Sequence, residues 1–92
     1  MDLLTEEQIA ERLAGLSGWK RENDSIVRVA KLADFKAAML YVGAVAYLAE
    51  SANHHPDISI AWNKVTLTLS THSAGGLTNK DFALAGQISA LG

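Results

Sequence analysis

Three histidines, His54, His55 and His72, are the residues of this chain best suited to proton transfer near neutral pH. The first two are adjacent and directly precede the only proline, Pro56. An imidazole gains and loses its proton close to pH 7, so it can act as a general acid or a general base. The cluster therefore indicates acid–base chemistry, with a plain helix end at the His-His-Pro corner as the alternative.

Two carboxylates stand at spacings that could support these histidines. Glu50 lies four residues before His54, and residues at that spacing share one face of a helix. A carboxylate there can orient the imidazole and favour its protonated form, or it can be an ordinary pair at a helix end. Asp81 is the last residue of the capping-box pattern that starts at Thr78, which gives it a structural role as well.

Metal and nucleophile chemistry are less favoured by the pattern. The histidines and Glu50 could supply ligands, but the sequence has no H-x-x-x-H or H-E-x-x-H spacing. Ser51, Ser70 and Ser73 lie near histidines in sequence without forming a nucleophile elbow. We therefore expect no metal site.

The elements that must position these residues alternate between helices and hairpins. Capping boxes and helical spacing predict helices that start at Thr5, run from about Asp34 to Asn53, and start at Thr78. Alternating apolar residues predict two hairpins, one with strands 19–22 and 25–31 and one with strands that begin near Ile58 and Val65. The order α-β-β-α-β-β-α predicts a two-layer α+β fold, a four-stranded antiparallel sheet with three helices on one face.

The second hairpin carries two residues of possible functional interest. Trp62 continues the alternation of Ile58 and Ile60, which would place its indole in the core or in the wall of a pocket for a flat ligand. His72 follows the last strand on its polar side, where a solvated strand-end histidine is the alternative.

The helix from Asp34 to Asn53 has no charged residue between Lys36 and Glu50. Its apolar surface runs nearly all round, so the helix must be buried on more than one side. We expect one side to pack on the sheet and the other on a second copy of the chain, with Val42 and Val45 as interface positions. The alternative is a helix covered by the other two helices of its own domain.

Composition narrows the class further. The 92 residues predict a single domain over 1–92, and the 49% hydrophobic content is sufficient for a packed core. A net charge of -2 without a basic run argues against direct nucleic-acid binding. No stretch reaches the ~20 apolar residues of a membrane span. The acidic start without a basic n-region predicts a cytoplasmic protein.

Taken together, these residues resemble the pterin-4a-carbinolamine dehydratase family. The family pattern is an acidic residue, three residues, His-His-Pro, five residues, an aromatic, nine residues, His, eight or more residues, and Asp. The chain meets every spacing with Glu50, His54, His55, Pro56, Trp62, His72 and Asp81. It departs from relatives at Ala30 and Leu32, where aromatics are frequent, and at Ser73-Ala74, where some carry Asp-Cys.

The resemblance implies an enzyme that removes water from a 4a-hydroxytetrahydropterin to give the quinonoid dihydropterin, without a metal or other cofactor. It implies His54 and His72 as acid and base in an unassigned order, and His55 as a pterin-binding residue. By the same resemblance Glu50 would orient His54, Asp81 would position His72 or a polar edge of the pterin, and Trp62 would line the pocket. It also implies a tetramer built from two dimers.

A second function on the same fold is a non-catalytic interaction or assembly protein. One animal member of the family also serves as a dimerisation cofactor of a homeodomain transcription factor, and other relatives have lost the active site. Because the full set of histidines and carboxylates is present here, the sequence favours the enzyme.

Overall fold

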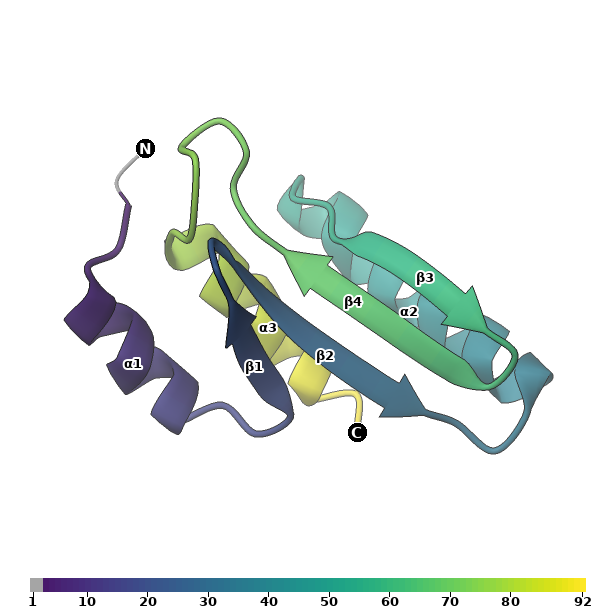
Figure 1. Ribbon diagram of the computed structural model, residues 1–92. Helices are drawn as coiled ribbons and strands as arrows, with labels where there is room; N and C mark the ends of the chain where they lie inside the picture. The colour runs from purple at the N-terminus through teal and green to yellow at the C-terminus, as the bar shows by residue number, and fades with distance from the viewer. Residues whose placement is uncertain (1–2) are drawn as a thin grey trace.

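The computed structural model describes residues 3–92 and has the predicted order of elements. The helices are α1 (Glu6–Ala14), α2 (Phe35–Ala52) and α3 (Asn79–Ser89), and the strands are β1 (Trp19–Glu22), β2 (Ser25–Lys31), β3 (Asp57–Ala61) and β4 (Lys64–Leu69). All four strands form one antiparallel sheet in the order β1-β2-β4-β3 (Figure 1). The predicted α+β class is confirmed.

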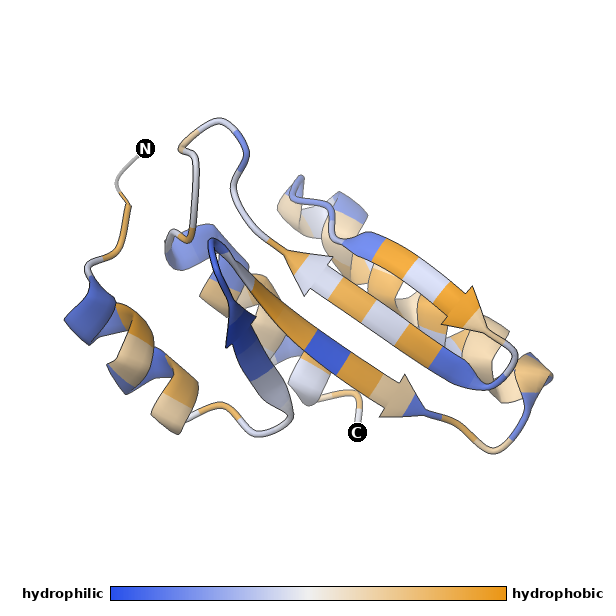
Figure 2. Ribbon diagram, in the orientation of Figure 1, coloured by the Kyte–Doolittle hydropathy of each residue, from blue (hydrophilic) through white to orange (hydrophobic). Residues whose placement is uncertain are grey.

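The sheet has one buried face and one open face. Val65, Leu67 and Leu69 of β4 are fully buried, whereas Thr66 and Thr68 between them are half-buried. The same alternation is visible along β4 in Figure 2. Since successive residues of a strand point to opposite faces, the buried set faces α2 and α3, which lie behind the sheet in Figure 1.

The hydrophobic core joins all three helices to this face. Helix α1 lies alongside β1 at the sheet edge and reaches the core through Ile9 (Figure 1). Trp19 of β1 is buried, and its Nε1–H donates to Ser89 Oγ at the end of α3 over 3.0 Å. The buried apolar residues are Ile9, Trp19, Ile26, Ala38, Tyr41, Val45, Ala49, Val65, Leu67, Leu69, Leu77, Phe82, Leu84, Ala85 and Ile88.

A surface ion pair fastens α1 to β1. The Arg21 guanidinium donates to both carboxylate oxygens of Glu6, one of them over 2.8 Å. These hydrogen bonds lower the pKa of Glu6 and raise that of Arg21. Because the pKa of Glu6 is lower in the folded state, the ion pair stabilises the folded state at pH values above the unfolded pKa of a glutamate. This stabilisation is lost as the pH falls through the folded-state pKa. Glu6 is solvent-exposed and Arg21 is only partly buried, so solvent screens the pair and it contributes little to stability.

The second hairpin turns one residue earlier than its alternation predicts. β3 ends at Ala61, and Trp62 lies in the turn with φ 53°. Trp62 is 64% exposed, so it is neither a strand residue nor a core residue. The left-handed backbone at Trp62 takes it out of the alternation that Ile58 and Ile60 follow.

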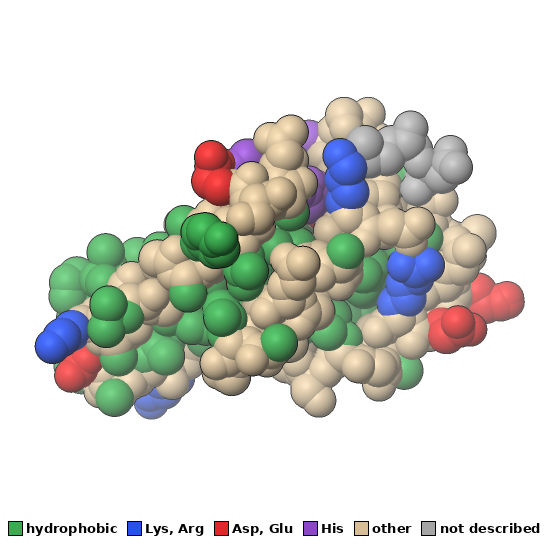
Figure 3. Space-filling view, turned by 180° about the vertical axis from the view of Figure 1, so that it is seen from behind, with side chains coloured by type: hydrophobic (Ala, Val, Ile, Leu, Met, Phe, Trp, Pro, Cys, Tyr) green, Lys and Arg blue, Asp and Glu red, His purple; other side chains and the backbone are tan. Residues whose placement is uncertain are grey.

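Helix α2 is apolar on two sides, and the fold covers only one of them. Val45 and Ala49 are buried against the sheet, while Leu40 is 67% and Tyr47 is 73% exposed on the opposite side. Figure 3 shows hydrophobic side chains gathered over the α2 side of the molecule, with few charges among them. The prediction of Val45 as an interface position is therefore wrong, because that side chain belongs to the core of its own chain. No helix within residues 3–92 is long and apolar enough to cross a membrane.

Helix α2 ends where the chain reverses toward β3. Asn53 takes the left-handed conformation, with φ 50° and ψ 44°. The backbone N–H groups of Asn53 and His54 donate to Glu50 O and Ala49 O, over 3.2 and 3.1 Å. This is a helix C-terminus closed by one left-handed residue, and asparagine tolerates that conformation better than most residues do. His54 consequently lies beyond the helix.

This helix end yields a stability prediction. Asn53→Gly should fold with nearly unchanged stability, because glycine adopts the left-handed conformation without strain. Asn53→Val should lose about 1–2 kcal/mol in urea unfolding, because its branched Cβ crowds the backbone there. Ser51→Val, two residues earlier on the exposed helix surface, serves as the matched control and should lose well under about 1 kcal/mol. Equal losses at both positions would contradict this account of the helix end.

Candidate active site

The three histidines line one pocket of about 310 Å³ at an end of the sheet. The lining comes from three separate segments: the residues after α2, the residues after β4, and the first turn of α3. These segments meet at the upper end of the molecule in Figure 1. The lining residues are Asn53, His54, His55, Ser70, Thr71, His72, Ser73 and Lys80.

The loop from β4 to α3 brings His72 to the pocket. Thr71 forms an isolated bridge with Gly76, and its carbonyl accepts from the N–H groups of Ala74, Gly75 and Gly76. His72 lies at the start of this tight loop and is solvent-exposed. A loop held by so many backbone hydrogen bonds keeps its shape, so the position of His72 relative to β4 is well fixed.

The centre of the site is the carboxylate of Asp81, which is completely buried. Its Oδ1 lies 2.6 Å from His54 Nε2. Its Oδ2 accepts from the Thr71 hydroxyl over 2.8 Å and from the Thr78 N–H over 2.9 Å. A buried carboxylate is costly unless it is paired and hydrogen-bonded, and here both oxygens have partners.

Asp81 therefore serves the site and the helix together. The Thr78 N–H bond completes the capping box that the sequence predicts at the start of α3. The same side chain also meets His54, which the sequence does not suggest, because the two residues are 27 positions apart.

The pairing of carboxylates with histidines differs from the prediction. Glu50 Oε2 lies 2.5 Å from His55 Nε2, and not beside His54. The expectation that Glu50 orients His54 rests on a helix continuing to His54. Because Asn53 turns out of the helix, His54 leaves the face that it would share with Glu50, and the partner of His54 is Asp81.

Asp81 was expected to position His72 or a polar edge of the substrate, and the first of these is wrong in this geometry. The carboxylate is enclosed by His54, Thr71 and Thr78, and His72 makes no hydrogen bond to it. The His54 side chain is 11% exposed, whereas that of His55 is 54% exposed. The three imidazoles thus stand in different surroundings within one pocket.

Three predicted site residues, Glu50, Trp62 and Asp81, do not line this pocket. Glu50 and Asp81 are linked to it through His55 and His54, whereas Trp62 lies away from it. Trp62 lies at the far end of β3 from His55, and five strand residues span about 17 Å. Within one chain it cannot form the pocket wall.

The pocket also includes Asn53, Thr71 and Lys80, which the sequence patterns did not indicate as site residues. Thr71 precedes His72, and strand alternation alone would assign it to the buried face of β4, where a hydroxyl needs a partner. That requirement is the signal that could have linked it to a buried carboxylate. For Lys80 the signal is the capping box, because it places residue 80 in the first turn of α3, next to Asp81.

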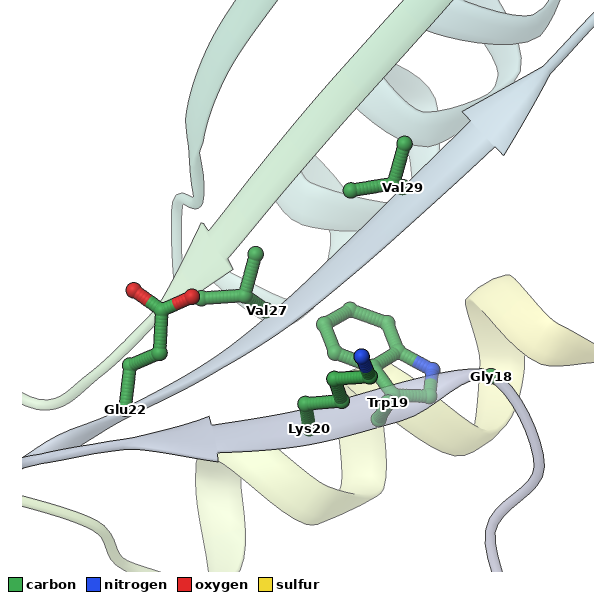
Figure 4. Close-up of a pocket in the computed structure, with 6 residues that line it drawn as sticks. All are labelled: Gly18, Trp19, Lys20, Glu22, Val27 and Val29. Atoms are coloured by element: carbon green, nitrogen blue, oxygen red, sulfur yellow. The ribbon is translucent and has the colours of Figure 1, made fainter.

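No three His, Asp or Glu side chains within residues 3–92 come together in a way that could hold a metal ion. A second pocket of about 400 Å³ lies on the open face of the sheet (Figure 4). Val27 and Val29 of β2 line it together with Lys20 and Glu22 of β1. It is larger but has no histidine, so the smaller pocket is the one whose groups can exchange protons near neutral pH.

The histidine pocket can deliver and remove protons on one bound molecule. His54 is held against a buried carboxylate, while His72 enters from a different segment and is more exposed. Two imidazoles in different surroundings on one pocket are suited to paired acid and base roles.

Comparison with known proteins points to the same chemistry. The chain is 56% identical over 86 residues to a protein of Roseiflexus castenholzii, covering 94% of this chain and 92% of that protein. It is 53% identical over 91 residues to a protein of Acidobacterium capsulatum, covering 99% of both. Both relatives are provisionally named pterin-4-alpha-carbinolamine dehydratase.

Two solved structures share the fold. A crystal structure of a transcriptional coactivator/pterin dehydratase from Brucella melitensis superposes with a TM-score of 0.94 at 36% identity, covering 98% of each chain. A pterin dehydratase-like protein, described as a RuBisCO assembly factor in the alpha-carboxysome, matches with a TM-score of 0.64 at 20% identity, over 79% of this chain and 84% of that chain. That second likeness concerns the fold alone.

A family profile described as pterin 4 alpha carbinolamine dehydratase matches residues 2–91, nearly the whole chain. With the identities above, this match settles the ancestry that the histidine pattern suggested: the chain belongs to the pterin 4 alpha carbinolamine dehydratase family.

Proposed function

We propose that this protein is a dehydratase that removes water from a 4a-hydroxytetrahydropterin and releases the quinonoid dihydropterin. The observation that carries the proposal is the meeting of His54, His55 and His72 in one pocket, with a buried carboxylate behind His54. Family membership supports the same reaction.

The reaction requires two proton transfers and involves no net oxidation or reduction. The C4a–O bond breaks as a proton is delivered to the leaving hydroxyl, which departs as water. A ring N–H proton is removed, and its electron pair forms the new double bond. An acid and a base on opposite sides of a flat ring can supply both transfers. Such chemistry requires no metal or redox cofactor.

We assign His54 and His72 to these transfers, because they reach the pocket from different segments of the chain. His55 is assigned to substrate binding, with its ring held by Glu50 at the pocket rim. Asp81 acts through His54, which it orients. Trp62 receives no role in the pocket of its own chain.

The first test is kinetic. His54→Ala and His72→Ala should each lower kcat by roughly 10²–10⁴-fold, the usual range for loss of a general acid or base. The double variant should fall by less than the product, because acid and base serve one event. His55→Ala should mainly raise KM, since a lost binding contact weakens ground-state affinity. The assay follows quinonoid formation by absorbance from freshly generated 4a-carbinolamine.

Thermal melts of the same variants provide the control for folding. Unchanged rates in His54→Ala and His72→Ala, with unchanged melting, would rule out the proposed acid–base mechanism for this pocket.

The second test concerns metals. Activity should survive treatment with a chelator and removal of the chelator, because the proposed proton transfers use imidazoles alone. Elemental analysis of the purified protein checks the same point. One zinc per chain, with activity restored only by zinc, would overturn the proposal and favour a metal-activated water.

We also propose that α2 mediates self-association. The exposed side of the helix carries Met39, Leu40 and Tyr47, and its Gly43 leaves room for close approach of another surface. An exposed apolar patch on a small domain commonly marks an interface, and a second copy offers the identical patch for a two-fold contact.

Charges on this side of the helix should therefore dissociate the assembly. Leu40→Glu or Tyr47→Glu should give monomers in light scattering, because an unpaired charge in an apolar interface costs several kcal/mol. Val29→Glu, at an exposed apolar position on the open face of the sheet, is the matched control and should leave the assembly intact. An unmodified protein that is monomeric at micromolar concentration would end the proposal.

A second candidate function is protein interaction through the same exposed side of α2. The apolar residues of that side favour it, and relatives described as a coactivator and as an assembly factor share the fold. The carbinolamine assay separates the two candidates: a pure interaction protein would leave the rate of water loss at its uncatalysed value.

A further inference from the structure

We propose that Thr71 is a positioning residue for His54, acting through Asp81, and this inference rests on the dehydratase function proposed above. Thr71 is buried and is not part of the family pattern that identifies the site. Its hydroxyl contacts Asp81 Oδ2 and Thr78 Oγ1, each over 2.8 Å. The geometry points to a short chain of hydrogen bonds that ends on His54.

The number of hydroxyl hydrogens available determines which group donates in each of these hydrogen bonds. A carboxylate can only accept, so the single hydroxyl hydrogen of Thr71 goes to Asp81 Oδ2. Thr71 Oγ1 then has only lone pairs left for Thr78, so the Thr78 hydroxyl must donate to it. Thr78 Oγ1 in turn accepts from the Lys80 N–H over 3.3 Å. Each hydroxyl in the chain therefore has one role as donor and one as acceptor.

Among residues 3–92, this arrangement leaves Asp81 Oδ1 with one hydrogen-bond partner, His54. With Oδ2 occupied by Thr71 and by the Thr78 N–H, the carboxylate plane is fixed and Oδ1 lies 2.6 Å from His54 Nε2. Nε2 must then carry the hydrogen in the neutral ring, which leaves the lone pair on Nδ1. His54 thus presents Nδ1 as its free nitrogen, in the tautomer suited to accepting a proton from a bound molecule.

Thr71 also connects the two histidines mechanically. Its side chain holds the partner of His54, and its backbone is the anchor of the loop that carries His72. Replacing only the hydroxyl separates these effects, because valine has the same shape and keeps every backbone hydrogen bond. Thr71→Ser keeps the hydroxyl and loses a methyl group.

The proposal is tested most directly by measuring which ring nitrogen of His54 carries the hydrogen. Long-range ¹H–¹⁵N correlation spectra of the labelled, substrate-free protein distinguish a hydrogen on Nδ1 from one on Nε2. They are recorded at a pH at which the ¹⁵N shifts themselves show a neutral ring. We expect a single Nε2–H tautomer in the unmodified protein and in Thr71→Ser, and a mixture in Thr71→Val. An Nδ1–H or mixed tautomer in the unmodified protein would overturn the proposal, even if no variant folds.

The kinetic arm tests the consequence for catalysis. Thr71→Val should lower kcat by about 10- to 100-fold with little change in KM, as expected when an acid–base group is misplaced but binding contacts remain. Thr71→Ser should recover most of the rate. Thr66→Val, a matched change on the open face of the same sheet, should retain the full rate.

The two arms separate this inference from the function on which it rests. If Thr71→Val keeps both the rate and the single tautomer, or if Thr71→Ser is as slow as Thr71→Val, Thr71 is not the positioning residue. If the unmodified protein shows no dehydration, the proposed function fails, while the tautomer measurement still decides whether Thr71 and Asp81 set the state of His54.

Discussion

The buried carboxylate of Asp81 is the interaction on which the rest of the site depends. It joins the segment after α2, the segment after β4 and the start of α3 through His54, Thr71 and Thr78. A charge excluded from water is tolerated only when its oxygens are satisfied, so these three segments must meet in one arrangement. The position of His54, the proposed acid–base group, is thereby set by the same contacts that close this end of the fold.

The use of one side chain for two purposes couples helix formation to site geometry. Asp81 completes the capping box of α3, and the first turn of that helix cannot fray without releasing His54. Small domains have few buried positions, and sharing a polar residue between a cap and a site avoids burying a second charge. It also predicts that loss of Asp81 would affect folding and chemistry together.

The two sides of α2 have different roles: one packs in the core, and the other is exposed and available for contact with another surface. Val45 and Ala49 hold the helix to the sheet, while Leu40 and Tyr47 face outward. The helix also ends at the pocket, where Asn53 directs the chain to His54. An assembly built on the outward side would therefore rest on the same helix that ends at the histidine pocket, without occupying the pocket.

The sequence by itself determined the elements, the caps and the candidate residues of this protein. Local hydrogen-bonding signals such as Thr5-to-Gln8 and Thr78-to-Asp81, together with apolar periodicity, depend on neighbours along the chain, so they could be predicted. The family pattern predicted that the three histidines belong to one site. The distances and partners of their side chains could be described only from the folded structure.

Only the tertiary structure decided which groups meet. The left-handed residue Asn53 moves His54 off the face of Glu50, and the length of β3 places Trp62 at the end of the strand away from the pocket. The bonds from Asp81 to His54 and Thr71 span 27 and 10 positions, so no local pattern signals them. A change in one backbone dihedral redirects the chain that follows it. The dihedral that a residue adopts depends on packing between segments that are distant in sequence, and periodicity and spacing do not describe that packing.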